Sequence, residues 1–419
     1  MSYSESDESD TVPNSLNKRV SSFADLIRAG DGIHSVRGIC GFIRSVVLRI
    51  NDLMTRYSLG FDWIFRDADF QFILQNIFRM SSENPTFDLA NTPRVEYLFT
   101  LGLRRTWTPS DMVFKSLKNF INSSKLDHLS LYNVQGLQKG ILSQSNVKHI
   151  VLYQARAASI DSSIVEDLDS ITNSEGEEKR LRICPLESLE TDMNMTLAEQ
   201  VSLFHSRPHT SSVGHHLPGE AIFPYLTKLR LHCKRIHTSE FNIAANEILL
   251  NAPALEDLFI YNGDKLPTSY WPEHSVLPLR YSHLTRLRSF SLGTYIPIYK
   301  QIEILQCLCA DDPPPSLSEI IMEAMIDLRY GLLRGIKDAV RYIQWLSLDK
   351  LDMFLRRTGF ERVKKVVVRL GMAMDIYEPE DLDKEVTEGF VILWRTTIRD
   401  AVTRQLEMKA VEVNVELEL

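Results

Sequence analysis

Cysteine, long apolar runs and targeting signals are scarce in this chain of 419 residues, and each scarcity excludes a class of protein. The 5 cysteines are odd in number and scattered, which argues against a disulfide framework and favours reduced thiols in the cytoplasm or nucleus. The longest apolar runs fall far short of the roughly 20 residues that a membrane-spanning helix needs. Residues 1–17 lack the basic start and the apolar stretch of a secretory signal. We therefore expect a cytoplasmic or nuclear protein with no membrane partner.

Recognisable catalytic and cofactor motifs are also missing. The sequence contains no Gly-rich phosphate loop, no Gly-x-Ser-x-Gly nucleophile elbow and no His-Glu-x-x-His. We therefore expect neither an enzyme nor a cofactor, and no catalytic or metal-binding residues. The formal net charge of -8 argues against a domain that grips phosphate backbones, so no nucleic-acid partner is expected.

Apolar residues, by contrast, are abundant and regularly spaced. Hydrophobic residues make up 44% of the sequence. From about residue 40 onward an apolar-x-x-apolar-x-apolar pattern recurs; its last two apolar positions share one face of a short strand, and the first lies in the preceding turn. The copies are Ile43–Val46–Leu48, Leu98–Leu101–Leu103, Leu126–Leu129–Leu131, Val147–Ile150–Leu152, Leu226–Leu229–Leu231, Leu255–Leu258–Ile260, Leu287–Phe290–Leu292, Leu317–Ile320–Met322 and Val363–Val366–Val368, with a weaker copy at Leu186–Leu189.

Helical patterns separate these strands. Apolar residues at helical spacing predict helices over residues 69–80, 111–122, 239–250 and 299–309. A unit of one strand and one helix cannot bury its apolar face alone, so such units stack side by side. The copies lie roughly 20 to 50 residues apart, against about 20–29 in a regular leucine-rich repeat. The predicted fold class is therefore α/β, an irregular leucine-rich-repeat-like solenoid of alternating short strands and helices.

The repeats divide the chain into three parts. Residues 1–20, which are acidic and rich in Ser, predict a disordered tail. The solenoid is expected over residues 21–372. Residues 373–419 are expected to cap it with a helix over 389–409 and a terminal strand over 411–419, because a solenoid must cover its last apolar face.

Two polar insertions interrupt the repeats, and both are expected to be mobile. Residues 161–179 are acidic and Ser-rich, and residues 206–220 are rich in Pro, Gly and His. Histidines in and beside the second insertion could in principle bind a transition metal, but a solvated His-rich loop is the favoured interpretation. These histidines are His205, His209, His215 and His216.

Strand geometry singles out a further set of residues. If the alternating apolar residues point into the core, the residues between and after them point to the opposite face. In four copies the last of these positions is Tyr, Tyr, His and Tyr, which would stack as a recognition ladder on the concave sheet of a solenoid. The alternative is that strands simply favour aromatic residues. The candidate partner-binding residues are His128, Tyr132, His149, Tyr153, Arg230, His232, Phe259 and Tyr261.

The repeats also resemble a known family over roughly residues 20–370. Segments 124–131 (SKLDHLSL), 224–231 (PYLTKLRL) and 251–258 (NAPALEDL) look like those of the large fungal family of F-box/leucine-rich-repeat-like proteins. In that family an F-box docks an adaptor of a cullin ubiquitin ligase, and the repeats select the substrate. This chain departs from the pattern, because no Leu-Pro-x-Glu start and no Cys-Arg-x-Trp-like end precede residue 40. The resemblance therefore implies a substrate receptor, with an adaptor as partner only if an F-box exists outside this chain.

The function expected from these observations is that of a non-enzymatic protein-interaction scaffold, similar to the substrate-binding repeats of an F-box protein. Its partner would be a protein that the sequence does not identify. The alternative is a hydrolase or transferase with an unrecognised site between the solenoid and the C-terminal helices. A deep pocket lined by titratable groups would favour that alternative, and a long open strand face would favour the scaffold.

Overall fold

A computed structural model gives the fold, and it describes fifteen stretches of the chain. These are residues 11–31, 43, 45–50, 62–78, 96–123, 125–143, 145–158, 185–192, 197–204, 221–233, 239–262, 279–294, 313–327, 360–373 and 412–418. The chain divides into two compact units. The first unit comprises residues 1–186 and 194–215, and the second comprises residues 187–193 and 216–419.

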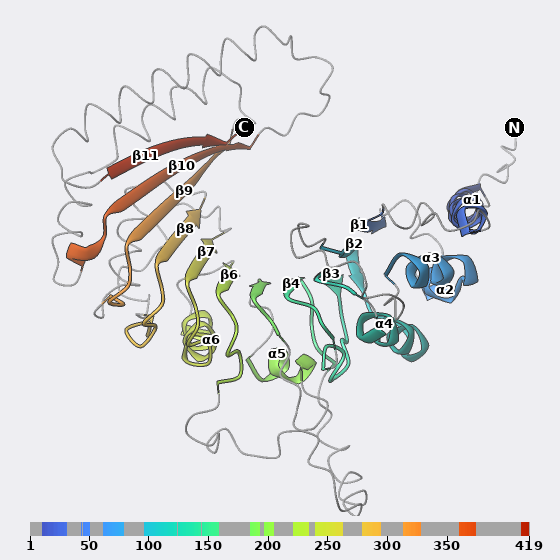
Figure 1. Ribbon diagram of the computed structural model, residues 1–419, viewed down its shortest axis with the longest axis horizontal. Helices are drawn as coiled ribbons and strands as arrows, with labels where there is room; N and C mark the ends of the chain where they lie inside the picture. The colour runs from blue at the N-terminus through green and yellow to red at the C-terminus, as the bar shows by residue number, and fades with distance from the viewer. Residues whose placement is uncertain are drawn as a thin grey trace, which may run out of the picture. The chain divides into compact units, whose positions relative to one another are not determined.

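Both units are mixed α/β structures built on open parallel sheet, in which neighbouring strands follow one another along the chain (Figure 1). The strands of the first unit are β1 (Ser45–Ile50), β2 (Leu98–Trp107), β3 (His128–Val134) and β4 (His149–Tyr153). Those of the second unit are β5 (Ser188–Thr191), β6 (Lys228–Cys233), β7 (Asp257–Asn262), β8 (Ser289–Thr294), β9 (Glu319–Asp327), β10 (Lys365–Ala373) and β11 (Glu412–Glu418). Every predicted copy of the repeat contains a strand, and β11 lies within the predicted terminal strand.

Helices lie between the strands, and three of them match the predicted ranges to within about two residues. The helices of the first unit are α1 (Thr11–Asp31), α2 (Asp62–Arg66), α3 (Ala68–Phe78), α4 (Asp111–Ser123) and α5 (Leu197–Phe204). The second unit contains α6 (Ser239–Leu250) and a short 3-10 helix, Phe360–Arg362. The predicted helices over 299–309 and 389–409 and the two insertions, 161–179 and 206–220, lie outside the described residues. Among the described residues, no helix is both long enough and apolar enough to cross a membrane.

Helix α1 begins within the segment that the composition assigns to a disordered tail. It starts at Thr11, so residues 11–20 are helical and the predicted tail boundary at residue 20 does not hold for them. Ala24 and Ile27, three positions apart, are both buried. Burial of these apolar residues therefore stabilises the second half of α1. The polar first half of the helix has no comparable apolar spacing.

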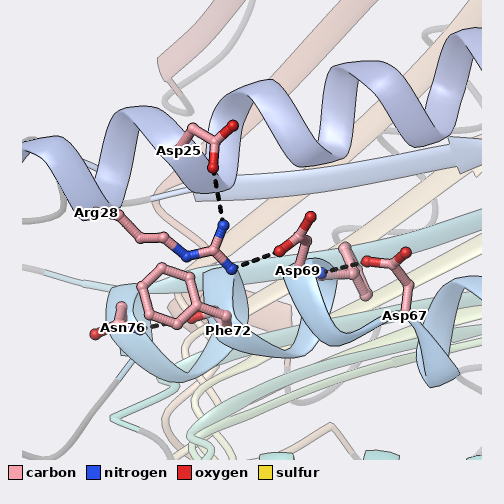
Figure 2. A network of polar contacts seen from close by, with 7 residues as sticks. Asp25, Arg28, Asp67, Asp69, Phe72 and Asn76 are labelled. Atoms are coloured by element: carbon pink, nitrogen blue, oxygen red, sulfur yellow. Dashed lines mark hydrogen bonds and ion pairs between the residues drawn. The ribbon is translucent and has the colours of Figure 1, made fainter.

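A single arginine links α1 to α3. The guanidinium of Arg28 forms ion pairs with Asp25 on its own helix and with Asp69 of α3, and it lies 4.6 Å from the centre of the Phe72 ring (Figure 2). The hydrogen bond from Arg28 holds the pKa of Asp69 below its ordinary value. These contacts fix which face of α1 meets α3.

The core lies on one face of the sheet because buried and part-exposed residues alternate along the strands. In β3, Leu129 and Leu131 are buried, whereas Tyr132 is part-exposed. In β6, Leu229 is buried and its neighbour Arg230 is exposed. The strand period of two therefore separates a leucine face from a face of polar and aromatic residues.

Helices α3 and α4 cover the leucine face in the first unit. Phe78 of α3 and Phe120 of α4 both contact Phe99 of β2, with ring centroids 6.4 and 5.1 Å from it. The Phe78 and Phe120 rings also meet each other edge to face at 5.3 Å. The remaining face of these strands points away from the two helices.

A repeated backbone contact joins neighbouring strands where they begin, from β2 to β4 and from β5 to β10. The carbonyl oxygen of Asp127, just before β3, accepts the N–H groups of Lys148 and His149, which lead into β4, at 2.9 and 3.0 Å. A carbonyl oxygen has two lone pairs, so one atom satisfies both donors. We call this contact the carbonyl ladder, and it sets the register of neighbouring strands. The other acceptors of the same kind are Tyr97, Glu187, Thr227, Glu256, Arg288 and Ser318.

In the second unit the repeat has one apolar position more than the sequence pattern predicts. This position lies three residues before the first residue of the pattern, which is Leu in four copies and Val363 in the fifth. Its carbonyl accepts the N–H group of that residue, as Leu284 does from Leu287 at 3.2 Å. All five residues at this position are buried. They are Phe223, Ala252, Leu284, Pro314 and Phe360. These five copies, which lead into β6 to β10, therefore enter their strands through a buried turn.

Candidate functional site

The structure places the eight candidate residues on the face of the strands opposite the buried leucines. Seven of them are part-exposed and Arg230 is exposed. We call this set the outward face. Its members are His128, Tyr132, His149 and Tyr153 in the first unit and Arg230, His232, Phe259 and Tyr261 in the second.

In the first unit the outward face forms two rows across β3 and β4. His128 aligns with His149, and Tyr132 aligns with Tyr153. The two imidazole rings stack almost parallel, with centroids 4.1 Å apart and planes at 16°. The two tyrosine rings lie 6.1 Å apart. The His128 Nε2 atom also lies 2.7 Å from Oε2 of Glu96, just before β2.

Matching backbone turns follow the two tyrosines. Asn133 and Gln154 directly follow Tyr132 and Tyr153, and their φ angles of 63° and 51° fall in the left-handed region that only a few per cent of non-glycine residues adopt. The side-chain amide of Gln135 donates a hydrogen bond to the Gln154 carbonyl at 2.8 Å. Both tyrosines are therefore followed by the same backbone conformation at the same level of the sheet.

In the second unit a carboxylate supports the outward face. Glu190 of β5 accepts a hydrogen bond from Nε2 of His232 at 2.8 Å, and its other oxygen lies 3.8 Å from Arg230. Burial by itself raises the pKa of Glu190, but the hydrogen bond and charge of His232 and the charge of Arg230 outweigh burial, so that the pKa is lowered. The carboxylate is thus held ionised and orients the imidazole.

Beyond His232, two aromatic rings lie over strand β8. The Phe259 and Tyr261 rings stack at 6.3 Å with planes at 13°, and Arg230 lies 5.6 Å from the centre of the Phe259 ring. A Cβ atom at Gly293, which aligns with Tyr261, would lie 2.9 Å from an atom of each ring. Glycine at position 293 therefore allows both rings to lie flat against β8.

The lowered pKa of Glu190 leads to a pH-dependent prediction. An acid whose pKa is lower in the folded protein stabilises it above the ordinary pKa, 4.5 here, and this stabilisation is lost as the pH falls through the folded value. We expect Glu190→Gln to lower the free energy of unfolding at pH 7 by up to about 1 kcal/mol, because the carboxylate is partly exposed. Urea unfolding of both proteins from pH 7 to pH 3 measures the difference, which should shrink below about pH 4.5. A difference that stays constant over this range would contradict the assignment.

Sequence reasoning missed three residues of these clusters: Glu96, Glu190 and Gly293. Glu190 occupies an outward position in the weaker copy at Leu186–Leu189, so extending the strand by one residue would have included it. Glu96 precedes its strand and carries no signal of its own. Gly293 follows the last apolar position of its copy, at the level where other copies carry Tyr or His.

Three of these side chains could hold a metal ion, although the sequence predicts no metal site. The ligand atoms of Glu96, His128 and His149 all lie within 4.8 Å of one another. The alternative enzyme site, between the repeats and the helix over 389–409, involves residues outside those that the structure describes.

Comparison with protein-family models, with curated proteins and with solved structures finds no match to this chain.

Proposed function

We propose that this chain is a non-enzymatic scaffold that binds a protein partner through the outward face. The observation that carries the proposal is the alignment of aromatic and charged side chains in rows on the face opposite the leucine core. Tyr and Arg are enriched among the residues that dominate binding energy at protein interfaces. Rings fixed by neighbouring strands also lose little freedom on binding, which favours affinity.

The scaffold that we propose is an irregular leucine-rich-repeat-like solenoid. Three observations support this interpretation: one strand per copy, a strand order that follows the chain, and a carbonyl ladder that joins seven pairs of neighbouring strands. The resemblance to F-box/leucine-rich-repeat-like proteins makes a substrate-receptor role the natural form of such binding. We place this role in the cytoplasm or nucleus, in keeping with the odd number and scattered positions of the cysteines.

Quantitative affinity purification from the cells that produce the protein tests the proposal. The test protein is the full chain with its four outward rings removed, Tyr132→Ala, Tyr153→Ala, Phe259→Ala and Tyr261→Ala. Because truncation of even one residue that dominates an interface costs about 2 kcal/mol or more, we expect partner recovery to fall more than tenfold. The matched control is Met112→Ala with Tyr225→Ala, two side chains that are 65% and 57% exposed but lie outside the outward face.

A second variant tests whether partner binding depends on the position of the rings as well as on their presence. Gly293→Val keeps all four rings of the outward face but pushes Phe259 and Tyr261 off β8, so it should weaken the same partner. Equal recovery of every partner by the wild type, the four-ring variant and Gly293→Val would overturn the proposal. Recovery of a cullin and its adaptor along with the partner would favour a ligase receptor, and their absence with other partners present would leave a free-standing scaffold.

A further inference from the structure

We propose that Glu96, His128 and His149 form a binding site for one divalent transition-metal ion, of which Zn²⁺ suits the ligands best. The site belongs to the first unit alone, and it does not depend on a protein partner. Among the described residues, these three form the one group of His, Cys, Asp or Glu side chains whose ligand atoms lie close enough together to hold a metal ion.

The backbone fixes the two histidines side by side. His128 and His149 begin neighbouring parallel strands and align with each other, and the carbonyl ladder at Asp127 holds this end of both strands. Parallel neighbours lie about 4.8 Å apart, so the two side chains leave the sheet as a pair. Their stacking, with ring centroids 4.1 Å apart, follows from this spacing.

The carboxylate of Glu96 completes the donor set. Its Oε2 atom lies 2.7 Å from Nε2 of His128, and the ligand atoms of all three residues lie within 4.8 Å of one another. Two donors on one tetrahedral zinc ion lie about 3.3 Å apart, since each is roughly 2.0–2.2 Å from the metal. The present separations, 2.7 Å between Glu96 and His128 and no more than 4.8 Å between any two of the ligand atoms, differ from this value by amounts that side-chain rotation can supply.

The chemistry of the donors favours a transition-metal ion over Mg²⁺ or Ca²⁺. Two imidazole nitrogens and one carboxylate oxygen, with a fourth position left to water, match a common zinc-site composition. Imidazole ligands suit Zn²⁺ and Cu²⁺, whereas Mg²⁺ and Ca²⁺ prefer oxygen ligands alone. The Glu96 side chain is 56% exposed, so the fourth position opens toward solvent.

The second unit supplies an internal comparison. His232 and Glu190 form a similar hydrogen-bonded pair at 2.8 Å, but the residue aligned with His232 in β7 is Tyr261, which offers no second imidazole. A Glu–His pair alone is therefore not expected to hold the ion, and His232→Ala is the matched control for His149→Ala.

Titration of the metal-free chain of 419 residues with Zn²⁺, in competition with a chromophoric chelator, tests the proposal. We expect the wild-type chain to bind one equivalent of Zn²⁺ in competition with the chelator. Its affinity for Zn²⁺ should fall at least about tenfold in His149→Ala and in Glu96→Gln and should not change in His232→Ala. Circular dichroism verifies the fold of each variant. Glu96→Gln replaces an exposed side chain by one of the same shape, so this variant reports on the site even if His149→Ala does not fold.

The histidines of the second insertion require their own variant, because a His-rich segment can bind zinc without a built site. The variant in which His205, His209, His215 and His216 are replaced by Ala should still bind one equivalent of Zn²⁺ in competition with the chelator. The proposal is overturned if the wild type takes up no Zn²⁺ in this assay, if Glu96→Gln binds it as the wild type does, or if the four-histidine variant abolishes uptake.

Discussion

Replacing Phe78 by alanine should lower the free energy of unfolding of the first unit by about 3–5 kcal/mol. The Phe78 side chain is 1% exposed, and its ring contacts those of Tyr97, Phe99 and Phe120 at centroid distances of 6.2, 6.4 and 5.3 Å. Truncation would leave a cavity where α3 and α4 meet β2, and a cavity that its surroundings only partly fill adds to the cost of the lost burial. Hydrogen exchange of the β2 and β3 amides under increasing urea measures the loss in this unit specifically.

The matched control lies on the same helix. Phe72 is part-exposed and its ring contacts Arg28, so Phe72→Ala removes the same number of atoms from a site that solvent already reaches. We expect a loss of no more than about 1–2 kcal/mol. Equal losses for the two variants would show that α3 does not present Phe78 to the sheet.

A second large effect is expected from Leu229→Ala in β6. Leu229 is 0% exposed, and truncating a fully buried leucine costs about 2–5 kcal/mol. Its neighbour Arg230 is exposed on the opposite face, so Arg230→Ala should change the free energy of unfolding by about 0.5 kcal/mol or less. Hydrogen exchange of the β6 and β7 amides reports both values.

This pair of variants tests the assignment of the two faces of the sheet. A one-residue slip of β6 would carry every side chain to the other face, so the two costs would exchange places. The outward face would then consist of leucines, and the proposed partner-binding rows would be core. Which of the two variants loses more free energy of unfolding therefore shows which face of β6 is buried.

Much of the fold follows from the sequence because the repeat carries its own periodicity. Two apolar residues two positions apart define a strand face, and this local rule placed a strand in every copy, down to the weak one at Leu186–Leu189. Helices α3, α4 and α6 were similarly predictable from apolar residues at helical spacing. Helix α1 is not among the predicted helices, because its first half has a composition typical of disordered segments.

The partners of the outward residues could not be predicted in the same way. Glu96 lies 32 positions before His128, and Glu190 lies 42 positions before His232. These pairs meet only because parallel strands align across intervening segments of unequal length, a property that no local window of sequence contains. Gly293 was overlooked for a related reason, because its effect lies in the space that it leaves for Phe259 and Tyr261 on the neighbouring strand.

The carbonyl ladder has a consequence for how such a chain can change over evolutionary time. It aligns consecutive strands at their first residues, whether the acceptor and the next donors are as close in sequence as Asp127 and Lys148 or as distant as Ser318 and Lys364. Segments between strands can therefore gain or lose residues without changing which residues align on neighbouring strands. Natural selection can alter the length of these segments and the side chains of the outward face independently, so new surfaces can arise on an unchanged frame.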